Sequence, residues 1–251
     1  MKNLFFGFIA VTILFSCQKQ HQKNEPDNKK PINIILMIGD GMGLSQVSAA
    51  FYLQQDATNF QRFKEVGLIK TSSSSHKITD SAAGATAFAT GDKSYNGAIG
   101  VNSDSIHIRN IVELASKSGK NSGVISTSSI THATPAAFYA HQKSRKMAES
   151  IAMDLIHAEV DFFGGGGKSF FFNRKDEIDG WEKLNDAGFE VDTIANFNKA
   201  YKNKKYGYLL ADDGMPRMLD GRGNFLPQST AAALRYLSKS DSGFFLMVEG
   251  S

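Results

Sequence analysis

Six polar residues spread along the 251-residue sequence could together hold a phosphate and the metal ions that act on it. Hard oxygen donors suit magnesium, and a mixed set of nitrogen and oxygen donors suits zinc. The planar fork of an arginine fits two phosphate oxygens. Hydroxyl, carboxylate, imidazole and guanidinium groups are all represented, in Asp40, Ser81, His132, Thr134, Arg145 and Glu249.

Ser81 has the clearest chemical use among these residues. It begins an alanine-rich segment, residues 80–90, that predicts a helix capped by Asp80 or Thr79. Unpaired amides and the helix dipole favour an anion at such a helix start. A nearby divalent cation would stabilise the serine alkoxide, so a phosphate bound there would meet a nucleophile.

Each candidate also has an ordinary structural explanation when it is considered alone. The aspartate lies in a Gly-Asp-Gly turn, the serine could be only a cap, and the histidine only a polar loop residue. The arginine could lie on a solvated helix face, and the glutamate could simply end a strand. The glycine run 164–167 lacks the spaced glycines and lysine of a P-loop, and we interpret it as a tight turn.

Strand patterns, most of them apolar runs, alternate with helical patterns along most of the chain. The runs 32–38, 66–70, 121–127, 160–163, 189–191, 206–210 and 243–248 predict strands, and segments 44–53, 80–90, 108–118, 134–157, 181–187 and 229–238 predict helices. This alternation predicts an α/β fold with a central, mostly parallel sheet and helices on both faces. The first run is typical of a strand covered on both faces. Ligands of such sheets bind beyond the carboxyl ends of the strands, where several candidates lie.

The helix expected over residues 134–157 would begin with Thr134 as N-cap and Pro135 in its first turn. It would carry Arg145 about three turns in.

Composition excludes several classes of protein. The sequence is 41% hydrophobic and 21% charged, which is too apolar for a disordered chain. Its formal charge of +3 lies entirely in residues 1–30, so residues 31–251 are neutral, which argues against a nucleic-acid partner. With one cysteine, Cys17, neither an intrachain disulfide nor a cysteine zinc site can form.

The two ends of the sequence carry further expectations. Lys2 and the apolar stretch 4–15 indicate a signal peptide over residues 1–17, and Leu14–Cys17 resembles a bacterial lipobox that leaves a lipid on Cys17. A plain secretory signal is the alternative, and both export the protein. Residues 18–30 are almost without apolar side chains and predict a flexible tether. The last strand lies so near Ser251 that we expect residues 31–251 to be an incomplete α/β domain.

Four segments, in this order, closely resemble the alkaline phosphatase family. They are NIILMIGDGMG at 33–43, TDSAAGATAFATG at 79–91, THATPAAFYAHQKSRK at 131–146 and FFLMVEG at 244–250. NGAIGVN at 96–102 and DFFGGGGKSF at 161–170 also fit, so the resemblance extends from about residue 32 to the end.

The resemblance implies a role for each candidate. Asp40 would bridge one zinc and the magnesium, and Ser81 would be the nucleophile that becomes phosphoserine. Arg145 would bind the phosphate, with Asp80 helping to orient it. Thr134 and Glu249 would be magnesium ligands. His132 stands where family members have aspartate or histidine, so it could bind metal directly or through water.

The implied activity is hydrolysis of small phosphomonoesters with Zn²⁺ and Mg²⁺, by two in-line displacements. The family's remaining zinc ligands follow the VEG motif, so we expect residues 1–251 alone to be inactive. The resemblance also implies a possible homodimer, and the leader implies a periplasmic or membrane-anchored lipoprotein. Two alternatives stay open: a related phosphodiesterase or sulfatase-type hydrolase, and a non-catalytic surface lipoprotein that binds phosphate.

Overall fold

The computed structural model describes residues 31–199, 201–202 and 205–251. Pro31–Ser251 form one unit. The predicted signal peptide, the lipidation site Cys17 and the tether lie outside the described residues. Within the described part of the chain, no helix combines the length and the apolar character needed to cross a bilayer.

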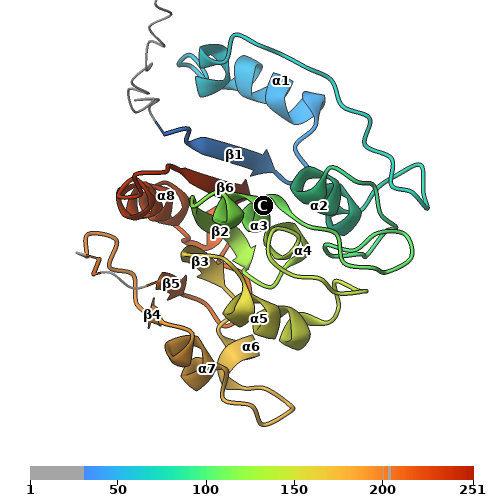
Figure 1. The fold of residues 1–251 in the computed structure, drawn as a ribbon. Helices are drawn as coiled ribbons and strands as arrows, with labels where there is room; N and C mark the ends of the chain where they lie inside the picture. Colours follow the sequence, from blue (N-terminus) through green and yellow to red (C-terminus); the bar gives the residue numbers. More distant parts are fainter. Residues whose placement is uncertain (1–30, 200, 203–204) are drawn as a thin grey trace, which may run out of the picture. The chain divides into compact units, whose positions relative to one another are not determined.

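The described strands form one six-stranded sheet in the order β1-β6-β2-β3-β5-β4, and every neighbouring pair is parallel (Figure 1). This confirms the predicted α/β fold. The strands are β1 (Ile34–Gly39), β2 (Asn121–Ser129), β3 (Phe162–Gly166), β4 (Phe189–Asp192), β5 (Lys205–Leu209) and β6 (Phe244–Gly250).

Helices lie in most of the connections between the parallel strands, whereas the described residues between β4 and β5 contain none. The helices are α1 (Leu44–Leu53), α2 (Ser81–Thr90), α3 (Ile111–Lys117), α4 (Ala133–Ala136), α5 (Ala148–His157), α6 (Ser169–Phe172), α7 (Gly180–Asp186) and α8 (Phe225–Leu237). Short 3₁₀ turns lie at Asn59–Arg62 and Met218–Asp220.

Strand β6 shows why helices lie on both faces of the sheet. Successive side chains of a strand point to opposite faces. Phe245 and Met247 pack in the apolar cluster that contains residues of α2, α3, α4 and α5. Phe244, Leu246 and Val248 pack in a second cluster with residues of α8. Both faces of β6 are therefore buried, which explains why its sequence is continuously apolar from Phe244 to Val248.

The single helix expected over residues 134–157 is wrong. The structure has a short helix α4 and a separate helix α5, and His132, not Thr134, is the N-cap residue of α4. Between the two helices, Gln142 exchanges backbone hydrogen bonds with Ile99 at 3.0 and 2.9 Å. The amide of Arg145 donates to the carbonyl of Gly97 at 2.8 Å. These bonds replace the helical ones, so Arg145 lies in a loop.

Strand β1 is not covered on both faces as expected. It lies at the edge of the sheet, and its side chains Ile34, Ile35 and Met37 are 44–66% exposed. The strand expected at residues 66–70 is also absent from the described chain, where Val66 and Leu68 are over 90% exposed. Apolar composition alone did not distinguish these segments from buried strands, because burial depends on what packs against them.

The glycine run is mostly strand, not turn. Gly164, Gly165 and Gly166 belong to β3, and Gly167 follows with φ of +97°. A Cβ at Gly166 would come within 1.8 Å of the carbonyl oxygen of Asp213. Glycine is needed here because two backbone segments approach closely.

Candidate active site

The start of helix α2 is fixed by its cap. Asp80 has extended backbone angles, and its Oδ1 accepts a hydrogen bond from the amide of Ala83 at 2.9 Å. The predicted cap is thus confirmed, and Gly91 ends the helix in a left-handed conformation with φ of 82°. Ser81 is therefore the first residue of a ten-residue helix. Its hydroxyl lies where unpaired amides and the helix dipole favour an anion.

A side chain distant in sequence holds the loop before α2. Asn96 accepts a hydrogen bond from the amide of Asp80 at 3.3 Å and donates to the carbonyl of Ile78 at 3.1 Å. Asn96 belongs to the segment 96–102 that the sequence analysis noted without assigning it a role. The same segment supplies the Gly97 carbonyl that accepts from the Arg145 amide. One loop therefore positions both the serine and the arginine.

The guanidinium of Arg145 is the centre of the site. Its Nη1 lies 3.1 Å from Ser81 Oγ and 3.2 Å from Asp80 Oδ2, and its Nη2 lies 3.0 Å from His132 Nε2. The side chains of Arg145 and Asp80 are each 27% exposed, so solvent still reaches the pair. A positive fork directed at a serine hydroxyl beside a helix start is suited to binding a phosphate.

Asp80 is held in its charged form. Partial burial opposes ionisation of this carboxyl group. Hydrogen bonds from the amides of Ala83 and Gly97, together with a hydrogen bond and charge attraction from Arg145, outweigh that effect and lower the pKa of Asp80. The carboxylate can therefore cap α2 through one oxygen and orient Arg145 through the other.

A cavity of about 380 Å³ opens beside Ser81. Three predicted site residues from different elements line it: Asp40 after β1, Ser81 at the start of α2, and Thr134 in α4. Asp80 also lines it. The cavity is large enough for a small phosphate ester, and its lining residues include carboxylates and hydroxyls.

Glu249 lies within β6, not after it as expected. The next residue, Gly250, is hydrogen-bonded to Asp40, which follows β1. The carbonyl of Gly250 accepts a hydrogen bond from the amide of Asp40 at 3.0 Å. Glu249 is fully buried, and its Oε2 accepts hydrogen bonds from Ser126 and Ser128. Glu249 is not one of the residues that line the cavity in the described part of the chain.

Two buried polar atoms near these residues have no hydrogen-bond partner in the described structure. They are Glu249 Oε1 and His132 Nδ1. A buried acceptor without a partner is unfavourable, and a carboxylate oxygen in that state is a natural cation ligand. Asp40, Thr134 and Glu249 offer hard oxygen donors, the type of ligand that suits magnesium. His132 uses Nε2 to accept from Arg145, which leaves Nδ1 as its other nitrogen.

Comparison with known proteins agrees with this fold. The model of the alkaline phosphatase family matches residues 31–251. The chain belongs to the alkaline phosphatase family.

Individual relatives share between about a third and a half of the aligned residues. Alkaline phosphatase 4 of Bacillus subtilis is 36% identical, with 98% of this chain and 56% of the relative covered. Alkaline phosphatase 3 of the same species is 39% identical over 94% of this chain and 54% of the relative. The solved alkaline phosphatase of the Antarctic bacterium TAB5 is 50% identical, with a TM-score of 0.86 over 89% of this chain and 66% of that structure.

The chain spans little more than half the length of the curated relatives it matches. A histidine-to-aspartate variant of the TAB5 enzyme has been solved with magnesium in a site called M3, and it is 51% identical to this chain with a TM-score of 0.86.

Sequence reasoning did not find every residue of the site. It missed the contact between His132 and Arg145 and the hydrogen bond between Asn96 and the amide of Asp80. It also missed the two serines that donate hydrogen bonds to Glu249. Asn96 could have been found, because it lies in a segment that already fitted the family pattern. The serines could not, because their position in β2 has meaning only once β2 pairs with β6.

Proposed function

We propose that the full-length protein hydrolyses phosphomonoesters, with Ser81 as the nucleophile that becomes phosphoserine. The observation that carries the proposal is the convergence of Ser81 Oγ, Asp80 and the Arg145 guanidinium at the start of α2, beside an open cavity. Membership of the alkaline phosphatase family supports the same reaction.

Each residue of the site would have a different role in phosphoryl transfer. Ser81 Oγ attacks phosphorus as its hydroxyl gives up its proton, and the ester oxygen leaves from the opposite side and takes up a proton to become the alcohol. The Arg145 fork and the α2 amides bind the remaining phosphate oxygens, whose charge the transition state spreads. Asp80 keeps Arg145 in place. Water then attacks phosphorus from the side the alcohol left, releasing phosphate and returning the proton to Ser81.

Magnesium and zinc are the cofactors that we assign to the reaction. Asp40, Thr134 and Glu249 would hold magnesium, and Asp40 with Ser81 would contribute to a zinc site. Bound metal ions would lower the pKa of the serine hydroxyl and of the attacking water and would stabilise the leaving oxygen. His132 would act toward magnesium directly or through water. The magnesium-bound relative, at 51% identity, supports the magnesium assignment.

The nucleophile can be tested by trapping the phosphoserine. Purified full-length wild type, supplied with zinc and magnesium, is incubated with radioactive phosphate at mildly acidic pH, quenched and digested. We expect label in the peptide that contains Ser81, and none in Ser81→Ala. Ser116→Ala is the matched control, because Ser116 is a helix serine whose hydroxyl bonds only to the exposed Glu159. Equal labelling of wild type and Ser81→Ala would contradict the assignment.

Turnover by the 251-residue chain is a separate question. The described histidines are absent from the lining of the cavity beside Ser81, so the zinc ligands of the family pattern are sparse here. We propose that residues 1–251 alone hydrolyse p-nitrophenyl phosphate very slowly even with added zinc and magnesium. Robust turnover by the purified chain would refute this.

Export and anchoring are also proposals. Residues 1–17 would be a lipoprotein signal, Cys17 the lipidated residue and residues 18–30 a tether to the domain at 31–251. The protein would be periplasmic or membrane-anchored and could act as a homodimer. Palmitate labelling of cells that express wild type or Cys17→Ser tests the anchor, with label expected only in the wild type.

A further inference from the structure

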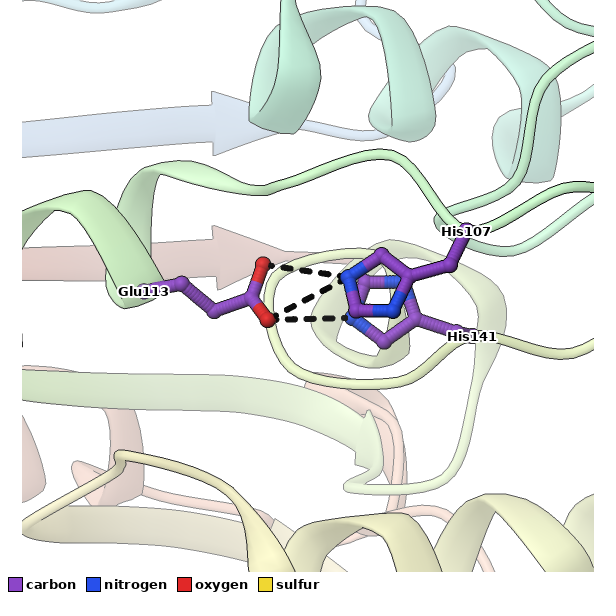
Figure 2. Close-up of side chains that lie close together, drawn as sticks. All are labelled: His107, Glu113 and His141. Atoms are coloured by element: carbon purple, nitrogen blue, oxygen red, sulfur yellow. Dashed lines mark hydrogen bonds and ion pairs between the residues drawn. The ribbon is translucent and has the colours of Figure 1, made fainter.

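Three side chains outside the Ser81 cavity converge on one point. His107 lies in the segment before α3, Glu113 in the first turn of α3 and His141 after α4 (Figure 2). Their ligand atoms all lie within 4.8 Å of one another. None of the three lines the cavity beside Ser81.

The separations between these atoms are those of ligands that share an ion. Glu113 Oε1 lies 3.3 Å from His107 Nε2 and 3.7 Å from His141 Nε2. Two donors bound at about 2.1 Å to one tetrahedral zinc are about 3.4 Å apart. A direct charged hydrogen bond would be shorter, at about 2.8 Å. The two imidazole rings stack with centroids 3.5 Å apart and 22° between their planes, and both lie beside the same carboxylate (Figure 2). For both Nε2 lone pairs to reach one ion, the half-exposed ring of His107 would turn.

Hydrogen bonds fix which atom of His141 faces the carboxylate. Its Nδ1 lies 2.7 Å from the carbonyl oxygen of Gly100, which can only accept, so Nδ1 carries the proton. In the neutral ring Nε2 then holds a lone pair, and this atom lies 3.5 Å from the side-chain nitrogen of Asn110 and 3.7 Å from Glu113 Oε1. Metal-binding histidines commonly donate their other nitrogen to a carbonyl in this way. Burial lowers the pKa of His141 and outweighs the opposing hydrogen bond with the Gly100 carbonyl, which favours the neutral ring.

Glu113 is also held in place by its surroundings. Its Oε2 accepts a hydrogen bond from the amide of Asn110 at 2.8 Å, as part of the capping box of α3. The carboxylate is thus fixed at the start of a helix, with Oε1 directed at both histidines. A second cavity, of about 240 Å³, borders Glu113 and His141 and leaves room for a solvent ligand.

We propose that His107, Glu113 and His141 bind a divalent transition metal ion, zinc above all, through two imidazole nitrogens and one carboxylate oxygen. Solvent would fill the fourth position. The ion would join the segment before α3 to the loop after α4. That loop carries Arg145 and is paired with residues 97–99. The ion would therefore brace the loop that holds the phosphate-binding arginine.

Zinc titration of purified protein tests the site. Wild type, His107→Gln and Glu113→Gln are compared by equilibrium dialysis with metal analysis. Glutamine at 113 can still accept from the Asn110 amide, and His107 is half exposed, so both variants should fold. We expect each variant to bind one zinc about tenfold or more weakly than wild type. The control is His76→Gln, an exposed histidine that bonds to Ser75. Unchanged zinc stoichiometry and affinity in His107→Gln would overturn the proposal.

Copper resonance spectra identify the ligands directly. Cu²⁺ added at one equivalent to wild type should show coupling to two imidazole nitrogens, and His107→Gln should show one. Circular dichroism of the metal-free proteins checks that the fold is kept. Identical copper spectra for wild type and His107→Gln would show that the three side chains form only an ion pair.

Discussion

Arg145 Nη1 lies 3.1 Å from Ser81 Oγ, although 64 residues separate the two in the sequence. The contact depends on a loop, because Arg145 is held by the Gly97 carbonyl and not by a helix of its own. The serine, in contrast, is placed by a helix that begins at its own cap. The site therefore joins a rigid helix start to a loop fixed by pairing with residues 97–99.

Replacing Arg145 with lysine keeps the charge and removes the fork. We expect kcat/KM of the full-length enzyme for p-nitrophenyl phosphate to fall by about 10- to 100-fold, because the variant loses one charge-assisted hydrogen bond to the phosphate. Inhibition by inorganic phosphate should weaken in parallel, since the same group binds the product. Arg217→Lys is the control, because Arg217 is exposed and pairs only with Asp220. If kcat/KM of Arg145→Lys stayed within twofold of the wild-type value, Arg145 would not be the residue that binds the phosphate.

Asp80 has two roles that substitution can separate. Asp80→Asn retains an oxygen for the Ala83 amide, whereas Asp80→Ala loses the cap and should lower the free energy of unfolding by about 1 kcal/mol. Both should lower activity, because neither variant has the charge that orients Arg145. Asp179 caps α7 in the same way, so Asp179→Ala should lose similar stability and keep activity. Denaturant unfolding and steady-state kinetics measure the two effects, and full activity in Asp80→Asn would exclude the orienting role.

Asp80 should also make the free energy of unfolding depend on pH in the acid range. Its pKa is lowered in the folded state, so as pH falls below the ordinary value of 3.8 the unfolded chain takes up a proton first. Its stabilising effect is complete above that value and is lost as pH falls through the folded pKa. The difference in melting temperature between wild type and Asp80→Asn should therefore be constant near neutral pH and shrink below about pH 4. A difference that grows on acidification would contradict this sign.

Magnesium should stabilise the protein through Glu249, whose Oε1 is buried without a partner. At about 100 times its Kd, magnesium would add about 2.7 kcal/mol, or roughly 5–10 °C in Tm. Glu249→Gln should lose most of this gain. Glu182→Gln, an exposed glutamate in the first turn of α7, should keep it. If magnesium raised the Tm of Glu249→Gln as much as that of wild type, Glu249 would not be a ligand of the ion.

Local sequence was enough for much of the fold. The helices at 44–53 and 81–90 and the central strands appear close to where their patterns predict them. The cap at Asp80 and the stop at Gly91 were also predicted, because capping depends on residues that are neighbours in the chain. The order of motifs identified the family, since each motif is a short continuous stretch.

Tertiary structure decided what depends on distant partners. Residues 137–147 have a helical composition, yet Gln142 and Arg145 bond to residues 97–99 and the helix breaks. The exposure of β1 depends on its place at the sheet edge, and the buried Glu249 depends on serines of β2. The cluster of His107, Glu113 and His141 is likewise invisible in the sequence. Sequence determines local preferences, whereas backbone pairing between remote segments decides which side chains meet.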